Sequence, residues 1–345
     1  MARIYRDEDY RPRPSRRGSR PRTKNRPNHD AAIDGLVTAV DRGRYRVVVS
    51  DDTSDVRDSP RTSAATSDVT AVRASHLRKD AVVPGDIVKL VGDTSGSKGS
   101  LARLVEITQR RTLLRRSADD TDPTERVIVA NVDVMAIVTA TEDPEPSYGL
   151  IDRALTAAFD AGITPLLIVT KTDLKPADDI IERFSETGVE IVSSGLRPDG
   201  TLTDATVFDR LQGQISVLVG HSGVGKSTLM NALVPRAERA TGHVNDVTGR
   251  GRHTSSSAIC IRLDGGGWLV DTPGVRSFGL AHVDRETLIS AFPELVGATA
   301  ECPRGCTHHA DAPGCRLDAW VSAGNAGPGG VSRLESLRRL LPTTG

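Results

Sequence analysis

Apolar and polar positions follow two different rhythms along this chain. From about residue 32 to residue 108, short alternating runs are separated by turn residues, and the runs 35–40 and 45–49 flank Asp41-Arg-Gly43. Such runs predict antiparallel strands joined by hairpins. Roughly five strands in about 75 residues indicate a small β-barrel, and the oligonucleotide-binding (OB) fold has this size.

Residues 127–220 alternate apolar strands with helical segments instead. We expect strands at 132–139, 165–169 and 190–192, helices at 150–161 and 177–187, and a short helix before residue 215. This β-α-β-α order predicts a parallel sheet with helices on both faces. Ligands bind such sheets at the carboxyl ends of the strands, so the functional motifs should directly follow strands.

The strongest motif follows the apolar run 215–219. Residues 220–227 match the G-x-x-x-x-G-K-S pattern of a phosphate-binding loop, and a helix-compatible run begins at Thr228. The glycines let backbone N–H groups surround a polyphosphate, and the helix N-terminus adds its positive dipole end. Lys226 should reach the β- and γ-phosphates, and Ser227 should ligate Mg²⁺. The expected phosphate contacts are Gly220, His221, Ser222, Gly223, Val224, Gly225, Lys226, Ser227 and Thr228.

Two further motifs follow strands. Thr170-Lys171-Thr172-Asp173 comes after 165–169, and its carboxylate can accept hydrogen bonds from N1 and N2 of guanine, a pair of donors that adenine lacks. The stem of Lys171 would cover one face of the base. The tetrapeptide is equally consistent with a helix-capping loop. After 190–192, Ser193 and Ser194 are weaker candidates for nucleotide contacts and are also consistent with a turn.

The segment 240–257 is rich in Gly, Thr, Ser and Arg, and we expect it to be mobile until a ligand orders it. Strands at 258–263 and 268–270 follow. Asp271-Thr-Pro-Gly274 comes next. The motif supplies an acid at the end of a strand and a glycine whose N–H can bond a γ-phosphate, and these two groups complete a Mg-nucleotide site. Asp271 would hold the metal through water.

Cys302, Cys306, His308 and Cys315 are the candidate metal ligands. Three thiolates and one imidazole form a closed tetrahedral set, which is typical of structural zinc. His309 is an alternative fourth ligand, although we prefer His308. Cys260 lies within an expected strand and is interpreted as a buried apolar residue. Leu334, Leu337 and Leu341, with arginines between them, predict an amphipathic helix that docks within a small zinc domain.

Charge is unevenly distributed, although the 45 basic and 45 acidic residues give a formal net charge of zero. Residues 1–29 carry ten Lys or Arg and three Asp or Glu, with few large apolar residues, so we expect a disordered tail. This tail either increases solubility or binds a polyanion, for which RNA is the better candidate. No apolar run spans a membrane, no secretory signal is present, and the cysteines suit a reducing cytosol, so a cytoplasmic protein is expected.

The order of the motifs is unusual, because the base-reading Asp173 precedes the phosphate loop and Asp271 follows it. This order is a circular permutation of an ordinary GTPase. With residues 130–133, Gly251-Arg-His-Thr254 and the Cys/His cluster, these motifs give the chain a resemblance to the bacterial ribosome small-subunit-dependent GTPase A family. The resemblance covers nearly everything from about residue 33 to the zinc cluster.

The resemblance implies a multidomain α/β protein. Its expected parts are a basic tail (1–31), an OB-fold RNA-binding domain (32–112), a permuted P-loop GTPase domain (113–283) and a zinc-binding C-terminal domain (284–345). It also implies late-stage maturation of the small (30S) ribosomal subunit, with the subunit and its 16S rRNA as partners of a monomer. GTP is the implied substrate, with Mg²⁺ and one structural Zn²⁺ as cofactors. Thr254 would meet the γ-phosphate and Mg²⁺ as its loop closes.

This chain departs from the family pattern at several positions. Thr170 replaces the usual Asn, which should weaken the bracing of its loop, and Ser255 and Ser256 replace threonines. The spacing from Cys302 to Cys306 is one residue shorter than usual, which leaves the imidazole ligand open. Val275, after Gly274, cannot orient water, so another group must position the nucleophile, and His253 is our candidate.

Two other functions fit parts of the sequence. A P-loop ATPase or kinase with an RNA-binding domain shares the phosphate loop, although Asp173 argues against adenine. An RNA-binding module with a vestigial nucleotide site would not need Lys226, Ser227 and Asp271, all of which are present.

Overall fold

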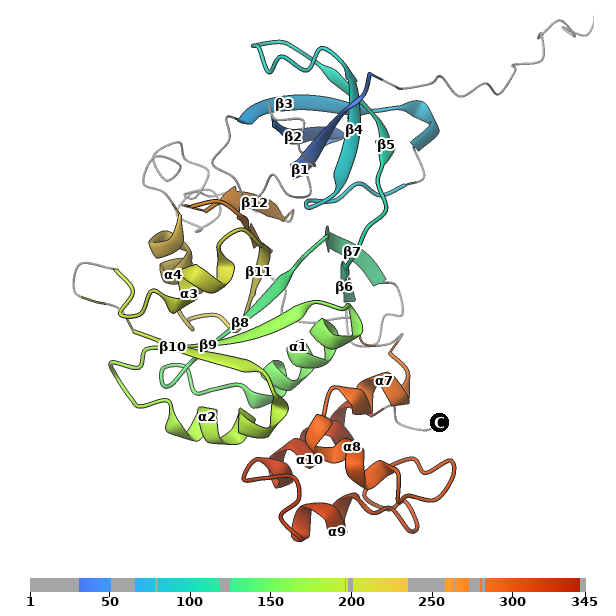
Figure 1. Ribbon diagram of the computed structural model, residues 1–345, viewed down its shortest axis with the longest axis vertical. Coiled ribbons are helices and arrows are strands. Elements are labelled where there is room, and N and C mark those ends of the chain that lie inside the picture. Colours follow the sequence, from blue (N-terminus) through green and yellow to red (C-terminus); the bar gives the residue numbers. More distant parts are fainter. Residues whose placement is uncertain are drawn as a thin grey trace, which may run out of the picture. The chain divides into compact units, whose positions relative to one another are not determined.

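The computed structural model (Figure 1) describes residues 31–50, 66–77, 80–117, 125–195, 197, 201–234, 258–263, 265–272, 280 and 283–341. Several predictions lie outside these residues. They concern the tail 1–30, the segment 240–257 with His253 and Thr254, and Gly274.

Residues 33–107 form a closed barrel of five strands, as the alternating pattern predicts. The strands are β1 (Ile33–Asp41), β2 (Arg44–Ser50), β3 (Thr66–Arg73), β4 (Ile87–Gly92) and β5 (Ala102–Ile107), and a short 3-10 turn, η3 (Ser75–Leu77), follows β3. They pair in the order β1-β2-β3-β5-β4, and β4 also pairs with β1, which closes the ring. Arg42 and Gly43, both at positive φ, form the predicted hairpin turn between β1 and β2.

A two-stranded ribbon follows the barrel along the chain. β6 (Leu113–Ser117) pairs antiparallel with β7 (Glu125–Ala130). Leu114 is buried opposite Val129 of β7. This pairing makes residues 113–117 a strand, although the arginines of the segment interrupt its alternation of apolar and polar residues.

The central domain is the predicted parallel sheet with helices on both faces. Its strands run in the order β10-β9-β8-β11-β13-β12. They are β8 (Val134–Ala140), β9 (Thr164–Thr170), β10 (Glu190–Ser194), β11 (Ile215–Val219), β12 (Ile259–Arg262) and β13 (Trp268–Asp271). Every neighbouring pair is parallel except β12 with β13.

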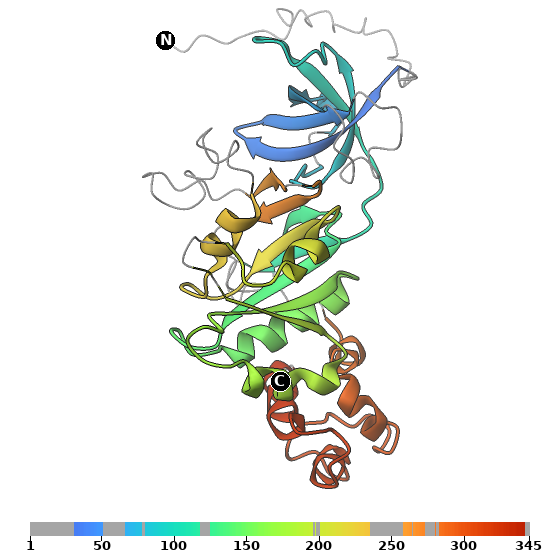
Figure 2. The same cartoon turned by 60° about the vertical axis from the view of Figure 1, so that its left-hand side comes forward.

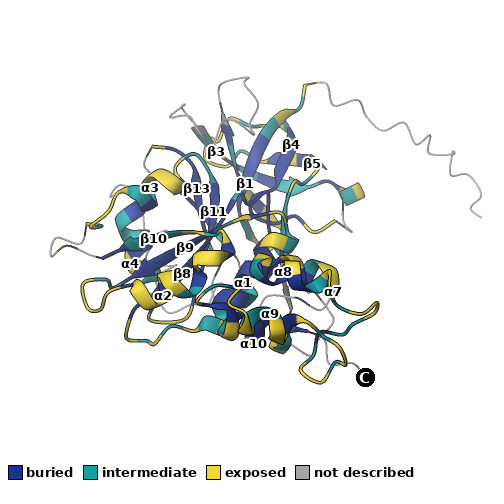
Figure 3. Ribbon diagram, turned by 60° about the horizontal axis from the view of Figure 1, so that its bottom comes forward, coloured by how far each residue is buried: buried dark blue, intermediate teal, exposed yellow. Residues whose placement is uncertain are grey.

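Among the described residues, two helices pack on each face of this sheet, whose arrangement Figure 1 shows. The helices α1 (Tyr148–Asp160) and α2 (Asp178–Phe184), the latter followed by the turn η4 (Ser185–Thr187), share one core with Met135 and Ile137 of β8. The helices α3 (Thr206–Leu211) and α4 (Lys226–Leu233) share the other core with Val134, Ala136 and Val138. Alternate residues of β8 therefore face opposite layers, which explains its continuous apolar sequence. Figure 3 shows these strands as buried between partly exposed helices.

The barrel and the central sheet are joined through backbone pairing. β12 pairs with β1 through Ala39 and Ile259, so the two sheets are continuous (Figure 2). Beside this joint, the side-chain amide of Asn131 donates to the Gly85 carbonyl at 2.8 Å. A Cβ at Gly85 would lie only 2.0 Å from the Ala130 carbonyl oxygen, so this position requires glycine.

The C-terminal residues form four helices around their own core. They are α7 (Arg285–Ser290), α8 (Pro293–Thr299), α9 (Leu317–Ser322) and α10 (Gly330–Leu340). The predicted amphipathic helix is α10, whose Leu334 and Leu337 pack into this core. Arg333, which precedes Leu334, is buried as well, with a side chain that is 1% exposed. Two buried carboxylates, described below, compensate its charge.

None of the helices within the described ranges is both long and apolar enough to cross a membrane.

Candidate active site and metal centre

The motifs at the ends of parallel strands meet at one edge of the central sheet. Thr170 ends β9 and pairs with Ala140 of β8 on one side and Ser194 of β10 on the other. β11 leads into the phosphate loop, and Asp271 ends β13. Because these strands are parallel, the four motifs share the carboxyl edge, where such sheets bind ligands.

The phosphate loop has the close-packed backbone that its glycines permit. A Cβ at Gly220 would lie 2.3 Å from the Val138 carbonyl oxygen, so only glycine fits there. Gly225, at φ +94°, precedes the first turn of α4. Lys226, the first residue of α4, donates from Nζ to the carbonyls of Gly220 and His221 at 2.7 and 2.5 Å. Its ammonium therefore lies over the loop that would surround a phosphate.

The base-reading loop is in direct contact with the phosphate loop. The Thr170 hydroxyl lies 2.6 Å from the Val224 carbonyl oxygen and 3.1 Å from that of Thr139. With one proton to donate, it bonds the nearer carbonyl. Threonine at this position was expected to weaken the loop's bracing, and the structure shows that it still provides one hydrogen bond to the phosphate loop. The two motifs can therefore serve one nucleotide.

Removing this hydroxyl should weaken nucleotide binding. We expect Thr170→Val to lower the affinity for GDP about 5- to 10-fold, because a neutral hydrogen bond contributes about 1 kcal/mol and the buried Val224 carbonyl would lose its partner. Titration with a fluorescent GDP analogue measures the change. Thr156→Val is the matched control, since its buried hydroxyl bonds the Asp152 carbonyl within α1. Equal affinities of the two variants would exclude this role for Thr170.

The segment 141–147, between β8 and α1, contacts both loops. Thr141 donates from its backbone N–H to the Thr170 carbonyl and from its hydroxyl to the Lys171 carbonyl. The Lys171 ammonium donates to the Asp143 carbonyl. A Cβ at Gly223 would lie 3.4 Å from Pro144. Sequence reasoning missed this segment, although its place directly after a strand could have revealed it.

Asp173 is exposed at the same edge, so its carboxylate is accessible to a ligand. Gly195 closes the other side, since a Cβ there would lie 3.2 Å from Asp173 Oδ1. The Gly195 N–H donates to the Thr203 hydroxyl at 2.8 Å, which fixes this loop, and Thr203 is a second residue that sequence reasoning missed. Ser194 is buried, whereas Ser193 is partly exposed.

Asp271 lies in an environment that disfavours its charge. Burial raises its pKa to about 6, and the positive charge of Lys226 and the Thr272 N–H oppose this rise only in part. A partly buried carboxylate near an ammonium at the end of a strand suits a divalent cation, which would hold it ionised.

This raised pKa predicts a pH-dependent cost to stability. A folded-state pKa above the usual value means that the protonated carboxyl stabilises the fold at low pH, and this contribution is lost as the pH rises through about 6. We expect Asp271→Asn to raise the free energy of unfolding at about pH 7.5 by about 1–3 kcal/mol without nucleotide or Mg²⁺, and to change it little at about pH 4. Urea unfolding at both pH values measures this, and a pH-independent difference would contradict it.

The structure brings the four predicted metal ligands together. One ligand atom from each of Cys302, Cys306, His308 and Cys315 lies within 4.8 Å of the others. Cys315 Sγ and His308 Nδ1 are 3.8 Å apart, close to the roughly 3.6 Å that tetrahedral zinc coordination requires. His308, not His309, belongs to this cluster. Its positive φ of 61° turns the chain after Cys306.

The donor set fits zinc. Three thiols and an imidazole match its preferred ligands, and burial lowers the His308 pKa, which keeps the ring neutral for coordination. Burial raises the pKa of Cys315 to about 11, so its thiolate requires a compensating cation at neutral pH. Cys260, buried in β12, lies outside the cluster as expected.

Known proteins of one family are similar to this chain over most of its length. The family described as RsgA GTPase matches residues 107–281. "Small ribosomal subunit biogenesis GTPase RsgA" of Pseudomonas aeruginosa (strain LESB58) is 36% identical over 283 residues, covering 78% of each chain. The protein of the same name from Chlorobaculum parvum is 32% identical over 320 residues, covering 90% of this chain and 97% of its own.

Two solved structures share the fold. YjeQ from Thermotoga maritima has a TM-score of 0.65 at 24% identity, covering 91% of this chain and all of its own. YloQ, described as a circularly permuted GTPase, has a TM-score of 0.63 at 22% identity, covering 92% of this chain and 99% of its own. The family match and the identities over most of the sequence show that this chain belongs to the RsgA GTPase family.

Proposed function

We propose that this chain hydrolyses GTP to GDP and phosphate when the small (30S) ribosomal subunit stimulates it, and that it acts late in the maturation of that subunit. The relatives are named small ribosomal subunit biogenesis GTPases, and this name supports the partner. The observation that supports the nucleotide assignment is the hydrogen bond from Thr170 to Val224, because it joins the segment 170–173 to the phosphate loop.

Under this proposal, different residues at the carboxyl edge of the central sheet bind different parts of the nucleotide. Asp173 accepts hydrogen bonds from guanine, and the stem of Lys171 covers the base. Residues 220–228 hold the phosphates. Ser227, Thr254 and Asp271 would hold Mg²⁺, which would neutralise charge on the phosphates. Thr172, Ser193 and Ser194 support the base-binding loops.

The remaining parts are proposed to contact RNA. The basic tail (1–31), the OB-fold domain (32–112) and the zinc domain (284–345) flank the GTPase domain (113–283) and would bind 16S rRNA. One structural Zn²⁺ would be held by Cys302, Cys306, His308 and Cys315, in keeping with their closed donor set. We propose that the protein acts as a monomer in the cytoplasm, where small subunits are assembled.

His253 is our candidate for positioning the attacking water, because Val275 cannot do so. We expect His253→Ala to abolish subunit-stimulated turnover, at an unchanged affinity for GDP. Single-turnover hydrolysis with saturating subunits and a fluorescent GDP titration measure the two quantities. Stimulated turnover that survives this substitution would remove His253 from the mechanism.

The experiment that tests the function is GTP turnover with and without purified small subunits. We expect slow turnover by the chain alone, a large increase with small subunits and none with large subunits. Lys226→Ala should remove the stimulated rate, since its ammonium binds the phosphates. Stimulation that is absent, or equal with either subunit, would refute the proposed partner.

A further inference from the structure

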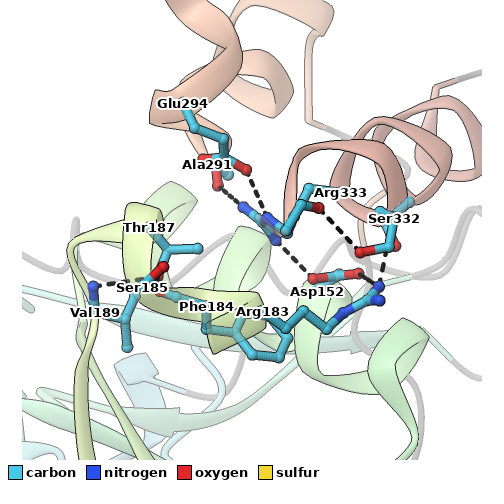
Figure 4. Close-up of polar contacts among 12 residues, drawn as sticks. Asp152, Arg183, Phe184, Ser185, Thr187, Val189, Ala291, Glu294, Ser332 and Arg333 are labelled. Atoms are coloured by element: carbon cyan, nitrogen blue, oxygen red, sulfur yellow. Dashed lines mark hydrogen bonds and ion pairs between the residues drawn. The ribbon is translucent and has the colours of Figure 1, made fainter. Parts of the chain in front are cut away.

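Arg333 is the centre of a buried charge cluster between the C-terminal helices and α1 (Figure 4). Its Nη1 donates to Asp152 Oδ1 and its Nε to Glu294 Oε1, both at 2.6 Å, and its Nη2 donates to the Ala291 carbonyl at 3.1 Å. The guanidinium carbon lies 4.1 Å from the centre of the Phe292 ring. Asp152 is on α1, whereas Glu294 is on α8. One arginine therefore fastens the two domains to each other.

A second arginine reinforces this attachment from the GTPase domain. Arg183, near the end of α2, stacks over Tyr148 with its guanidinium carbon 4.1 Å from the ring centre. It donates to the Ser332 carbonyl at 3.4 Å and lies 4.0 Å from Asp152 Oδ2. The start of α10 is thus held against both α1 and α2.

Such a cluster fixes the relative position of the helices more than it increases the stability of the fold. Arg333, Asp152 and Glu294 are each at most 2% exposed, so their desolvation offsets much of the attraction between them. Directional hydrogen bonds to a buried guanidinium, unlike apolar contacts, fix the position of one helix on another. The cluster therefore sets where α1 lies relative to α10.

The position of α1 matters to the nucleotide site because the helix begins directly after the segment 141–147. Tyr148, the first residue of α1, stacks under Arg183. Four residues earlier, Pro144 lies against Gly223 of the phosphate loop, and the Asp143 carbonyl accepts from Lys171. A displacement of α1 would consequently move groups that contact both nucleotide-binding loops.

We propose that Arg333 is a positioning residue for the nucleotide site, acting through Asp152 and α1. Docking of the C-terminal domain on α1 and binding of the guanine nucleotide are then thermodynamically linked, so each strengthens the other by the same factor. Arg338, on the same helix, bonds Asp318 and the His308 carbonyl, which connects α10 to the metal cluster as well. This inference rests on the proposed nucleotide site.

Two substitutions distinguish a role in positioning α1 from a role in the stability of the fold alone. Asp152→Asn and Glu294→Gln each remove one buried carboxylate charge 2.6 Å from Arg333, but only Asp152 belongs to α1. With a fluorescent GDP analogue as the probe, we expect Asp152→Asn to weaken binding about fivefold or more and Glu294→Gln to change it less than about twofold. Equal effects of the two variants, or none in either, would overturn the proposal.

A measurement on the unaltered full chain covers the case in which Asp152→Asn does not fold. Saturation with GDP should slow hydrogen exchange of the backbone amides of α10 by a factor similar to the coupling. Exchange in α10 that is unaffected by bound GDP would overturn the proposal. Failure of the unaltered chain to bind GDP at all would instead refute the nucleotide site itself.

Discussion

Asp173→Asn should change the nucleotide that this protein binds. The variant replaces one carboxylate acceptor with an amide donor opposite the 2-amino group of guanine, and we expect affinity for GTP to fall on the order of 10⁴-fold. Xanthosine triphosphate carries a carbonyl at that position and retains the N1 donor. It should therefore bind the variant better than GTP does. Competition of both triphosphates against a fluorescent nucleotide measures this change.

Asp178→Asn is the control for this experiment. Asp178 is an exposed aspartate in the first turn of α2, five positions after Asp173, and its replacement should leave the preference for GTP unchanged. A variant at Asp173 that keeps its preference for GTP would show that another group reads the base. A loss of all nucleotides alike would indicate a collapsed loop.

Cys315→Ser should release zinc and unfold the C-terminal helices. Structural zinc in small domains contributes roughly 10–16 kcal/mol, and the core of these helices is small and in contact with Cys315. We expect bound zinc to fall from one per chain to near none. Trp320, whose indole N–H donates to the Glu294 carbonyl at 3.0 Å, should become exposed and shift its fluorescence to the red.

Cys260→Ala provides the comparison for this prediction. Cys260 is buried in β12, where burial raises its pKa to about 12, and it has no place in the cluster. That variant should retain one zinc per chain and an unchanged Trp320 signal. Full zinc content in Cys315→Ser, or equal loss in both variants, would exclude the proposed ligand set.

Local sequence signals predicted those parts of the fold that depend on neighbouring residues. The strands of the barrel and of the central sheet follow from alternation and from apolar runs, and the glycines of residues 220–225 define a backbone that only they permit. The metal cluster was predictable because its four ligands lie within one short stretch. In each case the residues that determine the feature lie close together in the sequence.

Local sequence patterns could not predict contacts between residues that are distant in the sequence. β6 is a strand because Leu114 meets Val129, and Arg333 is buried because Asp152, 181 positions earlier, and Glu294 surround it. An arginine beside leucines in an amphipathic helix usually faces the solvent. Only the buried carboxylates around Arg333 show that this arginine is buried instead. The segment 141–147 is a different case, because its place directly after β8 is a local signal, whereas its contacts with Lys171 and Gly223 exist only once the sheet is assembled.

The central claim is that one guanine nucleotide spans the 170–173 and 220–227 loops. A crystal structure of the full chain with GDP and Mg²⁺ tests it most directly. We predict that the Asp173 carboxylate accepts hydrogen bonds from N1 and N2 of the base, while the backbone N–H groups of residues 220–227 surround the β-phosphate. A base bound away from Asp173, with the phosphates still in the loop, would contradict the claim.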